Sequence, residues 1–176
     1  MYSESKCPGD MSICIRMDYC PLDLGKLIDD KSFEISETDA IIIFKQILES
    51  VDYLNQNYLI HRDIKPPNVL LSNSGKFILT DFGLTRQLPS PGKEMTTGVV
   101  TRWYRAPELL FGSSMYGPKI DIWALGCLFV ELFIRKPLFP GTSDIDQLGR
   151  IFSLRGTPTS ETWSDVNQLP CYFEFE

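Results

Sequence analysis

The sequence has few of the features that mark secreted, membrane-spanning or nucleic-acid-binding proteins. It contains one histidine and five cysteines; the odd cysteine count and the lack of any C-x-x-C pair favour free thiols in a reducing compartment over a disulfide framework or a zinc site. The formal net charge of −6 argues against a nucleic-acid partner. Residues 1–10 carry no signal-peptide core, and the most apolar segment, residues 120–134, contains Asp121 and Glu131 and is too short to span a bilayer. We therefore expect a soluble intracellular protein.

The length and the composition are typical of a globular domain. The chain has 176 residues, of which 43% are hydrophobic and 23% charged. A chain of this length can bury a sizeable core. The sequence shows no internal repeat, low-complexity tract or linker, so we expect one folded unit.

The stretch from residue 61 to residue 83 is the most informative part of the sequence. Two short apolar runs, residues 69–71 and 77–79, flank the segment Ser72-Asn73-Ser74-Gly75. Serine, asparagine and glycine favour tight turns, and short apolar runs on either side of a turn are typical of paired strands. The pattern predicts a β-hairpin.

Polar side chains with chemical potential lie at both outer ends of this predicted hairpin. Asp63, Lys65 and Asn68 precede the first strand, and Asp81 follows the second. Because an antiparallel hairpin brings its outer ends together, we expect these four side chains to converge. Asp81 and Asn68 offer the hard oxygen ligands that Mg²⁺ prefers. A carboxylate without a metal could take a proton from a hydroxyl, and an ammonium could balance charge on a moving phosphoryl group.

Each of these residues also has an ordinary structural interpretation. Aspartates beside turns usually cap backbone N–H groups, Asn68 could be a turn residue, Lys65 could be a solvated charge, and a lone histidine such as His61 usually packs in the core. Together, however, the residues match H-R-D-x-K-x-x-N followed by D-F-G. This pair of motifs is the catalytic loop and the metal-binding motif of protein kinases. The combination therefore predicts a kinase site.

Helical periodicity predicts the framework around the hairpin. We expect a helix from the capping-box-like Ser36 to about Asn55, a nearly all-apolar buried helix opened by Pro118 and Asp121, and a helix from about Thr142 to Gly156. The side chains expected to face inward are Ala40, Ile43, Phe44, Ile47, Leu48, Val51 and Leu54 in the first helix; Ile120, Ile122, Trp123, Leu125, Leu128, Phe129, Leu132 and Phe133 in the second; and Ile145, Leu148, Ile151 and Phe152 in the third.

The remaining segments give weaker signals. Residues 13–17 alternate enough to form a strand, and Asp23 is placed to cap a short helix that buries Leu24, Leu27 and Ile28. Residues 84–101 are polar and rich in glycine, proline, serine and threonine, which predicts a long loop.

Further motifs identify the chain as resembling a eukaryotic protein kinase. Asp-Phe-Gly at 81–83, Ala-Pro-Glu at 106–108 and Asp-x-Trp-x-x-Gly at 121–126 occur in the family's order. The sequence VVTRWYRAPELL resembles cyclin-dependent kinases, and FGSSMYGPKIDIWALGC and FPGTSDIDQLGRIF followed by GTP resemble the branch that activates other cyclin-dependent kinases. The resemblance covers about residues 13–165.

The resemblance implies a fold and a domain organisation. It implies an α+β, protein-kinase-like fold: a mostly helical large lobe that carries the catalytic-loop hairpin, with the small lobe largely missing. Residues 1–20 would be a remnant of the small lobe and the hinge. Residues 21–176 would be the large lobe, incomplete at its C-terminal end.

The resemblance also implies roles for residues at the catalytic centre. Asp63 would be the catalytic base and Lys65 would contact the γ-phosphate, while Asn68 and Asp81 would hold Mg²⁺. The other residues implied to bind ATP are Met17 as gatekeeper, Asp18, Tyr19 and Cys20 as hinge, Asp23 at the ribose, and Leu70 under the adenine.

A regulatory site and a substrate pocket are implied in the 81–108 region. Thr96 lies where the family carries its activating phosphothreonine, with Thr97 beside it, and Arg62 and Arg86 would clamp the phosphate. The residues that resemble the pocket favouring proline after the target residue are Val99, Val100 and Arg105, with Thr101 tying this pocket to Asp63 and Lys65. Asp121 would accept backbone N–H bonds from the catalytic loop.

The implied cofactors are ATP and Mg²⁺, and the implied partners are a protein substrate and a cyclin. The family favours residence in the nucleus over the cytoplasm. We therefore expect a Ser/Thr protein kinase of the cyclin-dependent type, and the pocket implies that its target residues are followed by proline. The alternatives are a non-catalytic scaffold derived from a kinase and, disfavoured by the protein-substrate pocket, a small-molecule phosphotransferase.

The sequence departs from the kinase pattern before residue 17. It has no Gly-x-Gly-x-x-Gly loop, no V-A-I-K lysine and no helix with the partner glutamate, and Lys6 lacks a strand context. Losing one preorganised electrostatic contact typically costs about 10²–10³ in rate, so losing the lysine and the loop amides together should cost about 10⁴ or more. We therefore expect the 176-residue chain alone to be weak or inactive. Glu108 is also expected to lack its usual arginine partner, and an unpaired buried carboxylate costs about 3–5 kcal/mol.

Overall fold

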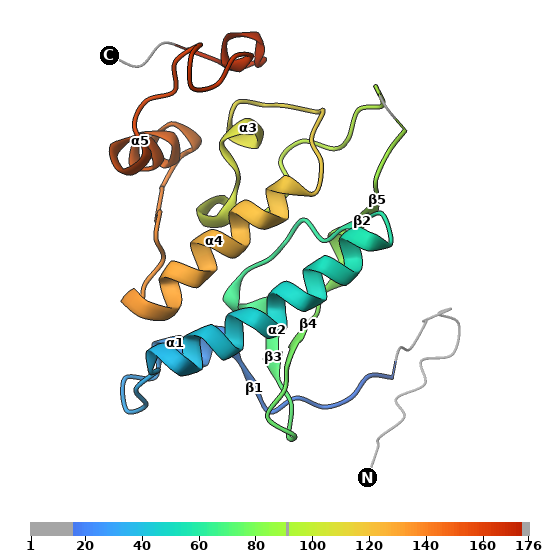
Figure 1. Ribbon diagram of the computed structural model, residues 1–176, viewed down its shortest axis with the longest axis vertical. Helices are drawn as coiled ribbons and strands as arrows, with labels where there is room; N and C mark the ends of the chain where they lie inside the picture. The colour runs from blue at the N-terminus through green and yellow to red at the C-terminus, as the bar shows by residue number, and fades with distance from the viewer. Residues whose placement is uncertain (1–15, 91, 174–176) are drawn as a thin grey trace, which may run out of the picture.

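The computed structural model describes residues 16–90 and 92–173. Two long helices, α2 and α4, pack against each other through the middle of the molecule, and Figure 1 shows them running side by side. A small sheet lies on the side of α2 away from α4, while α3 and α5 lie on the opposite side. The helices and strands are β1 (Leu22–Asp23), α1 (Leu24–Asp29), α2 (Glu37–Gln56), β2 (Leu59–Ile60), β3 (Val69–Leu71), β4 (Phe77–Leu79), β5 (Arg86–Gln87), α3 (Pro107–Leu110), α4 (Lys119–Ile134) and α5 (Asp144–Arg155), with 3-10 turns at Pro66–Asn68, Phe82–Leu84, Arg102–Tyr104 and Val166–Gln168.

The predicted hairpin is confirmed. Strands β3 and β4 pair antiparallel with Val69 opposite Leu79, and β1 joins the other edge of β3 in a three-stranded sheet. Gly75 turns the chain with φ +79°, a conformation that costs glycine little. One more backbone bond, from Thr80 N to Asn68 O at 2.9 Å, extends the pairing beyond the strands. The hairpin therefore holds Asn68 beside the residue that precedes Asp81.

Helix α2 forms because its N-terminus is capped and one of its faces is apolar. Ser36 and Asp39 form the expected capping box, in which each side chain accepts a bond from the other residue's backbone N–H. Most of the expected apolar stripe is buried, but Leu48 is 40% exposed, so its prediction as a core residue is wrong. The buried side chains face α4 and β4, and Leu48 lies beside Ile47 at the edge of that face.

Helix α4 is buried on one face and not all round. Its buried residues include Ile120, Leu125 and Leu128, but Ile122 and Phe133 are 49% and 45% exposed. The prediction that both are buried is therefore wrong. Composition alone cannot tell which sides of an apolar helix are covered. Within residues 16–90 and 92–173, no element fully covers the side of α4 that carries Ile122 and Phe133.

Helix α5 begins after Ser143, whose hydroxyl caps it, and ends at Gly156, which has φ +85°. Leu148, Ile151 and Phe152 are buried as predicted. Ile145 is 65% exposed, so its prediction as a core residue is wrong. It has the right periodicity but lies in the first turn, where no described side chain covers it.

Two segments outside the long helices, residues 84–101 and residues 13–17, need comparison with what the sequence predicts. The 84–101 region contains a short strand, β5, which pairs with β2 and is too short to leave a periodic pattern. In the expected strand at 13–17, residues 13–15 lie outside the described residues, and residues 16 and 17 have no regular structure. The predicted cap of α1 is confirmed, because the Asp23 carboxylate accepts a bond from Lys26 N at 2.9 Å.

Three cysteines in the described residues, Cys20, Cys127 and Cys171, are free thiols, whereas Cys7 and Cys14 lie outside those residues. Burial, together with the negative charge of the nearby Glu131, raises the pKa of the Cys127 thiol to about 12. In the part of the chain that the structure describes, no helix combines the length and the apolar character that crossing a membrane requires.

Arg135 fastens the end of α4 to the end of α1. Its guanidinium donates to the carbonyls of Ile28 at 2.8 Å, Leu27 at 2.9 Å and Phe33 at 2.9 Å, and also to that of Asp30. These bonds satisfy carbonyls that the end of a short helix leaves without partners.

Replacing Arg135 with alanine is expected to lower the free energy of unfolding by about 2–4 kcal/mol, because several hydrogen bonds to a charged group are lost together. Chemical denaturation followed by far-UV circular dichroism measures the change. Arg150→Ala is the matched control; Arg150 makes an exposed i,i+4 pair with Asp146, which is worth less than about 1 kcal/mol. Equal effects of the two substitutions would contradict the prediction.

Candidate active site

The Asp121 side chain of α4 anchors the loop that carries Asp63. The Asp121 carboxylate accepts bonds from His61 N at 2.8 Å and from Arg62 N at 2.9 Å, which confirms the predicted contact. Burial raises the pKa of Asp121, although these two N–H bonds oppose the rise. Arg62 has φ +70°, a conformation that costs a residue with a side chain about 1–3 kcal/mol. The anchor therefore holds the loop in a strained shape.

His61 links the same loop to the strand that leads to Asp81. The imidazole is fully buried; its Nε2 lies 3.0 Å from Thr80 O, and its Nδ1 accepts a bond from Asp63 N at 3.3 Å. These two bonds fit a neutral ring protonated on Nε2, because Nδ1 must accept while Nε2 donates. The edge of the ring contacts Phe82, with centroids 5.2 Å apart. His61 is thus a packed structural residue, as its ordinary interpretation predicts.

Asp63 is the centre of the polar cluster. Lys65 Nζ donates to Asp63 Oδ2 at 2.7 Å, Asn68 Nδ2 donates to the same oxygen at 2.9 Å, and the Thr101 hydroxyl donates to Oδ1 at 3.0 Å. Lys65 Nζ also donates to the Thr101 hydroxyl at 3.0 Å. Burial alone would raise the pKa of Asp63, but the bonds from Lys65, Thr101 and Asn68 outweigh it, so the pKa lies below its ordinary value. The carboxylate is therefore ionised at neutral pH.

Asp81 lies at the end of the hairpin in a left-handed conformation, with φ +62°. Its Oδ1 accepts a bond from Gly83 N at 3.3 Å, and the residue is exposed. Asn68 uses its amide nitrogen on Asp63, and its Oδ1 makes no hydrogen bond to the described residues. Asp81 and Asn68 thus keep free oxygen atoms that suit a hard cation. No group of three or more His, Cys, Asp or Glu side chains in the described part of the chain could hold a metal alone.

The residues predicted to bind adenine and ribose lie in residues 17–20 and on strands β1 and β3. Met17, Asp18, Tyr19 and Cys20 have no regular structure, and Met17 and Tyr19 are 76% and 78% exposed. The residues expected at the ribose and under the adenine, Asp23 and Leu70, lie opposite each other on β1 and β3. The Asp23 carboxylate already caps α1 and pairs with Lys26 at 3.0 Å, so binding a ribose hydroxyl there requires a shared or released cap.

The predicted phosphothreonine and its predicted clamp surround one cavity. Arg62, Arg86 and Thr96 all line a cavity of about 480 Å³. The structure adds Tyr116, whose hydroxyl accepts a bond from Arg62 Nη1 at 2.9 Å and donates to Thr96 O at 2.6 Å. Sequence analysis gave Tyr116 no role, although it lies within a stretch that resembles the family, because its partners Arg62 and Thr96 are far away in the sequence.

The residues predicted to form the substrate pocket also come together. Arg105 Nε donates to Val99 O at 3.0 Å, and Arg105 Nη2 donates to Val100 O at 2.9 Å. Val99 and Val100 are buried, and Val100 has φ +70°. Thr101 follows directly and contacts Asp63 and Lys65, so one short segment joins this pocket to the polar cluster. The structure adds Asp144, which pairs with Arg105 at 3.4 Å and which sequence analysis missed.

The comparisons with known proteins decide the family. The sequence matches the protein kinase domain family over residues 3–171. The chain belongs to the protein kinase domain family. The expected kinase-like α+β fold is confirmed by the solved structures that resemble this kinase domain: the CAK complex of Chaetomium thermophilum bound to ATP-gamma-S (TM-score 0.87, 42% identity, 89% of this chain and 49% of that one) and the yeast RNA Pol II CTD kinase CTDK-1 complex (TM-score 0.84, 40% identity, 88% and 50%).

Curated relatives place this kinase in the cyclin-dependent kinase group, near the branch that activates other cyclin-dependent kinases. It is 46% identical to cyclin-dependent kinase 7 of Caenorhabditis elegans over 161 residues, which are 92% of this chain and 49% of the relative. It is 41% identical to cyclin-dependent kinase D-1 of Arabidopsis thaliana over 169 residues, which are 96% of this chain and 42% of the relative. The chain thus spans about half the length of the curated relatives it matches.

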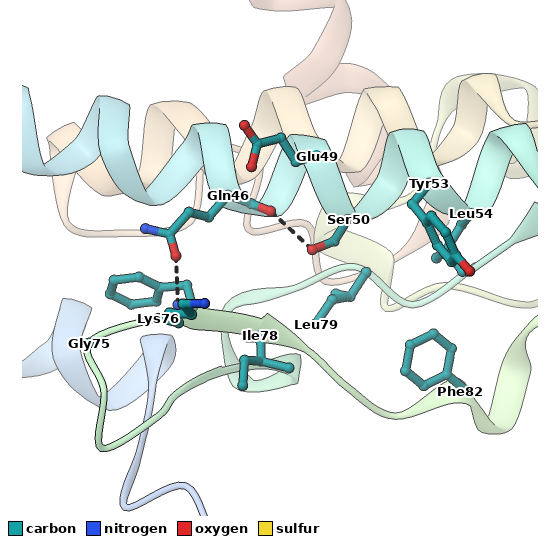
Figure 2. Close-up of a pocket in the computed structure, with 11 residues that line it drawn as sticks. Gln46, Glu49, Ser50, Tyr53, Leu54, Gly75, Lys76, Ile78, Leu79 and Phe82 are labelled. Atoms are coloured by element: carbon teal, nitrogen blue, oxygen red, sulfur yellow. Dashed lines mark hydrogen bonds between the residues drawn. The ribbon is translucent and has the colours of Figure 1, made fainter.

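A large groove lies outside the polar cluster. The groove has a volume of about 790 Å³ and lies between α2 and β4, where Gln46 Oε1 accepts a bond from Phe77 N at 3.0 Å (Figure 2). Phe82 of the D-F-G run lines it, but Asp63, Lys65, Asn68 and Asp81 do not. The groove is therefore a separate feature from the predicted phosphate site.

Glu108 is half-buried, and it makes no ion pair in the described part of the kinase. Burial raises the pKa of its carboxyl above the ordinary value of 4.5, and the Lys119 charge offsets the rise only in part. Since the folded state then holds this proton more tightly than the unfolded state, the stability contributed by Glu108 falls as pH rises above about 4.5.

Glu108→Gln is therefore expected to stabilise the 176-residue chain by about 1 kcal/mol at pH 7.5, because it removes a buried charge that lacks an ionic partner. The gain is expected to vanish below pH 4.5, where both states of the wild-type chain are protonated. Urea denaturation at several pH values measures it. Glu161→Gln, at an exposed position, serves as the control. A constant difference between wild type and Glu108→Gln across this pH range would contradict the prediction.

Proposed function

We propose that the gene product is a Ser/Thr protein kinase of the cyclin-dependent type, which transfers the γ-phosphate of ATP to serine or threonine hydroxyls of proteins. The observation that carries the proposal is the cluster in which Lys65, Asn68 and Thr101 all bond to the Asp63 carboxylate. An ionised, oriented carboxylate with an ammonium 2.7 Å away suits proton removal from an alcohol beside a phosphoryl group.

The roles proposed for the residues follow from their chemistry. Asp63 orients the substrate hydroxyl and accepts its proton as the new bond to phosphorus forms. Lys65 neutralises charge on the transferred group. Asn68 Oδ1 and the Asp81 carboxylate hold Mg²⁺, which when bound shields the phosphate charges. Asp23, Leu70 and residues 17–20 bind the nucleoside part of ATP.

We further propose that Thr96 is a phosphorylation site read by Arg62 and Arg86. The three residues line one cavity, and a phosphate adds nearly two negative charges that arginines bind well. A cyclin as partner, proteins with a proline after the target residue as substrates, and the nucleus as location are proposed from the family. The solved relatives are kinase complexes, which supports the proposal of a partner.

A phosphoryl-transfer assay tests the proposal. The gene product, purified with any subunit that accompanies it, is given labelled ATP, Mg²⁺ and a Ser-Pro peptide; we expect transfer that Asp81→Asn abolishes. The 176-residue chain alone is expected to transfer phosphate about 10⁴-fold more slowly or worse, because it has no glycine-rich loop and no strand lysine. Transfer by the gene product that does not depend on Asp81 would refute the proposed site.

The second candidate function is a non-catalytic scaffold, for which the buried residues Val99 and Val100, held by Arg105, would form a peptide-binding surface. If the gene product binds a Ser-Pro peptide but transfers no phosphate under the same conditions, the scaffold is correct and the catalytic proposal is wrong.

A further inference from the structure

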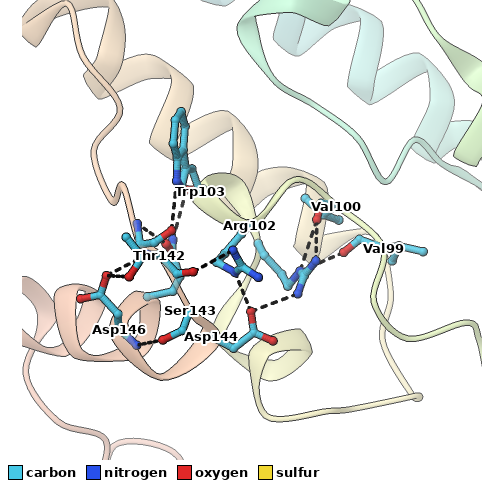
Figure 3. A network of polar contacts seen from close by, with 11 residues as sticks. Val99, Val100, Arg102, Trp103, Thr142, Ser143, Asp144 and Asp146 are labelled. Carbon is cyan, nitrogen blue, oxygen red and sulfur yellow. Dashed lines mark hydrogen bonds and ion pairs between the residues drawn. The ribbon is translucent and has the colours of Figure 1, made fainter.

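One carboxylate oxygen at the start of α5 is shared by two arginines from the substrate-binding loop, which we define as residues 99–105. Asp144 Oδ1 accepts from Arg102 Nε at 2.9 Å and from Arg105 Nη1 at 3.4 Å (Figure 3). Arg102 also donates to Thr142 O at 3.2 Å. Figure 3 shows the helix start and the loop meeting at this point.

The two arginines differ in what they support. The Arg102 side chain is 41% exposed and bonds only to the helix start, whereas the Arg105 side chain is 13% exposed and donates to the carbonyls of Val99 and Val100. Asp144 is the only carboxylate in the described residues that pairs with Arg105. It therefore fixes the guanidinium that holds the loop backbone.

Val100 needs this support. Its φ of +70° is unusual for a β-branched residue, which normally avoids that region. Arg105 Nε and Nη2 both donate to the Val100 carbonyl, at 3.3 Å and 2.9 Å. Without an oriented guanidinium, the strained backbone can relax and its carbonyl becomes free. Because Thr101 follows and bonds to Asp63, such a change reaches the catalytic carboxylate.

We propose that Asp144 is a positioning residue that fixes the substrate-binding loop through Arg105 and thereby sets selectivity for the residue after the phosphorylated one. This inference rests on the proposed kinase function. While Arg105 occupies the Val100 carbonyl, a peptide N–H that faces it finds no acceptor, and proline, which has no N–H, avoids that loss. When the carbonyl is released, residues with an N–H compete better with proline.

The test compares the gene product with its Asp144→Ala and Asp144→Glu variants on matched Ser-Pro and Ser-Ala peptides. We expect Asp144→Ala to lower the Ser-Pro to Ser-Ala ratio of kcat/KM at least about tenfold, the equivalent of one net hydrogen bond, mainly through KM. Asp144→Glu, which keeps the carboxylate, should restore most of the ratio. The pair of Asp144 with Arg102 is exposed, so Asp144→Ala should change global stability little.

Asp146→Ala is the matched control. Asp146 lies in the same first turn of α5 and bonds to Thr142 N at 2.8 Å, but it contacts neither Arg102 nor Arg105. It should leave the peptide ratio unchanged. An unchanged ratio in Asp144→Ala, or an equal fall in Asp146→Ala, would overturn the proposal, the latter because it would assign the effect to the stability of the helix start.

Hydrogen exchange of residues 99–105 separates this inference from the proposed function. We expect amide exchange in the loop to accelerate about tenfold or more in Asp144→Ala but not in Asp146→Ala or Asp144→Glu. If the wild-type protein transfers no phosphate, the kinase proposal fails, and the exchange result alone then supports or overturns the positioning role of Asp144.

Discussion

Replacing Asp63 with asparagine is expected to lower kcat for phosphoryl transfer by about 10²- to 10⁴-fold, the usual contribution of a positioned base. Asparagine keeps the size of the side chain and can still accept the bond from Thr101, but it cannot accept the substrate proton. It also removes the ion pair with Lys65 at 2.7 Å. Steady-state kinetics on the gene product would show the fall in kcat with little change in KM for ATP.

Two controls make the Asp63 result specific. Asp52→Asn replaces an exposed aspartate whose side chain, within the described residues, bonds only to Gln56, so the kcat of this variant should equal that of wild type. The pH profile is the second control. Because the pKa of Asp63 is held below its ordinary value of 3.8, the base stays deprotonated down to about pH 4, and its protonation should not limit the rate above that pH. A variant Asp63→Asn that keeps more than a tenth of the wild-type kcat would refute the assigned role.

Replacing Asp121 with alanine is expected to lower the free energy of unfolding by about 3 kcal/mol or more. The substitution leaves the N–H groups of His61 and Arg62 buried without partners, and each such group costs about 1–3 kcal/mol. The free energy of unfolding of Asp121→Asn should lie between those of wild type and Asp121→Ala. An asparagine oxygen can accept a bond from one N–H, while the NH₂ group of the asparagine faces the other N–H. Equilibrium denaturation measures the loss, and amide exchange should accelerate first at residues 61 and 62.

Asp146→Ala is the appropriate control for Asp121, because both residues are acidic and lie in the first turn of a helix. The Asp146 side chain is 35% exposed, so its loss removes a partly solvated helix-start contact worth about 1 kcal/mol or less. A loss in Asp121→Ala no larger than in Asp146→Ala would show that Asp121 acts only as a helix-start charge and does not anchor the catalytic loop.

Much of the site was predictable because its signals are local. The hairpin follows from two apolar runs around a turn, and α2 and α5 follow from caps and helical spacing. Asp63, Lys65 and Asn68 lie within six residues of one another, so any fold of that loop keeps them near each other. Their roles as base, phosphate contact and metal ligand stay predictions.

The failures share one cause. Leu48, Ile122, Phe133 and Ile145 have the apolar spacing of core residues, yet each is at least 40% exposed. Periodicity tells which residues share a face, but whether a face is covered depends on elements that are distant in the sequence. The short strand β5 was missed for a similar reason, since it pairs with β2, whose Leu59 lies 28 positions before its partner Gln87.

The sequence by itself determined the kinase family, the hairpin and the identity of the polar side chains at its ends, because all of these are written in short motifs with fixed spacing. Only the tertiary structure decided what holds those side chains in place. The bonds that Asp121 accepts from the catalytic loop, Tyr116 from Arg62 and Asp144 from Arg105 each join residues 39 to 60 positions apart. Contacts over such separations depend on how the helices pack, and no local pattern records them.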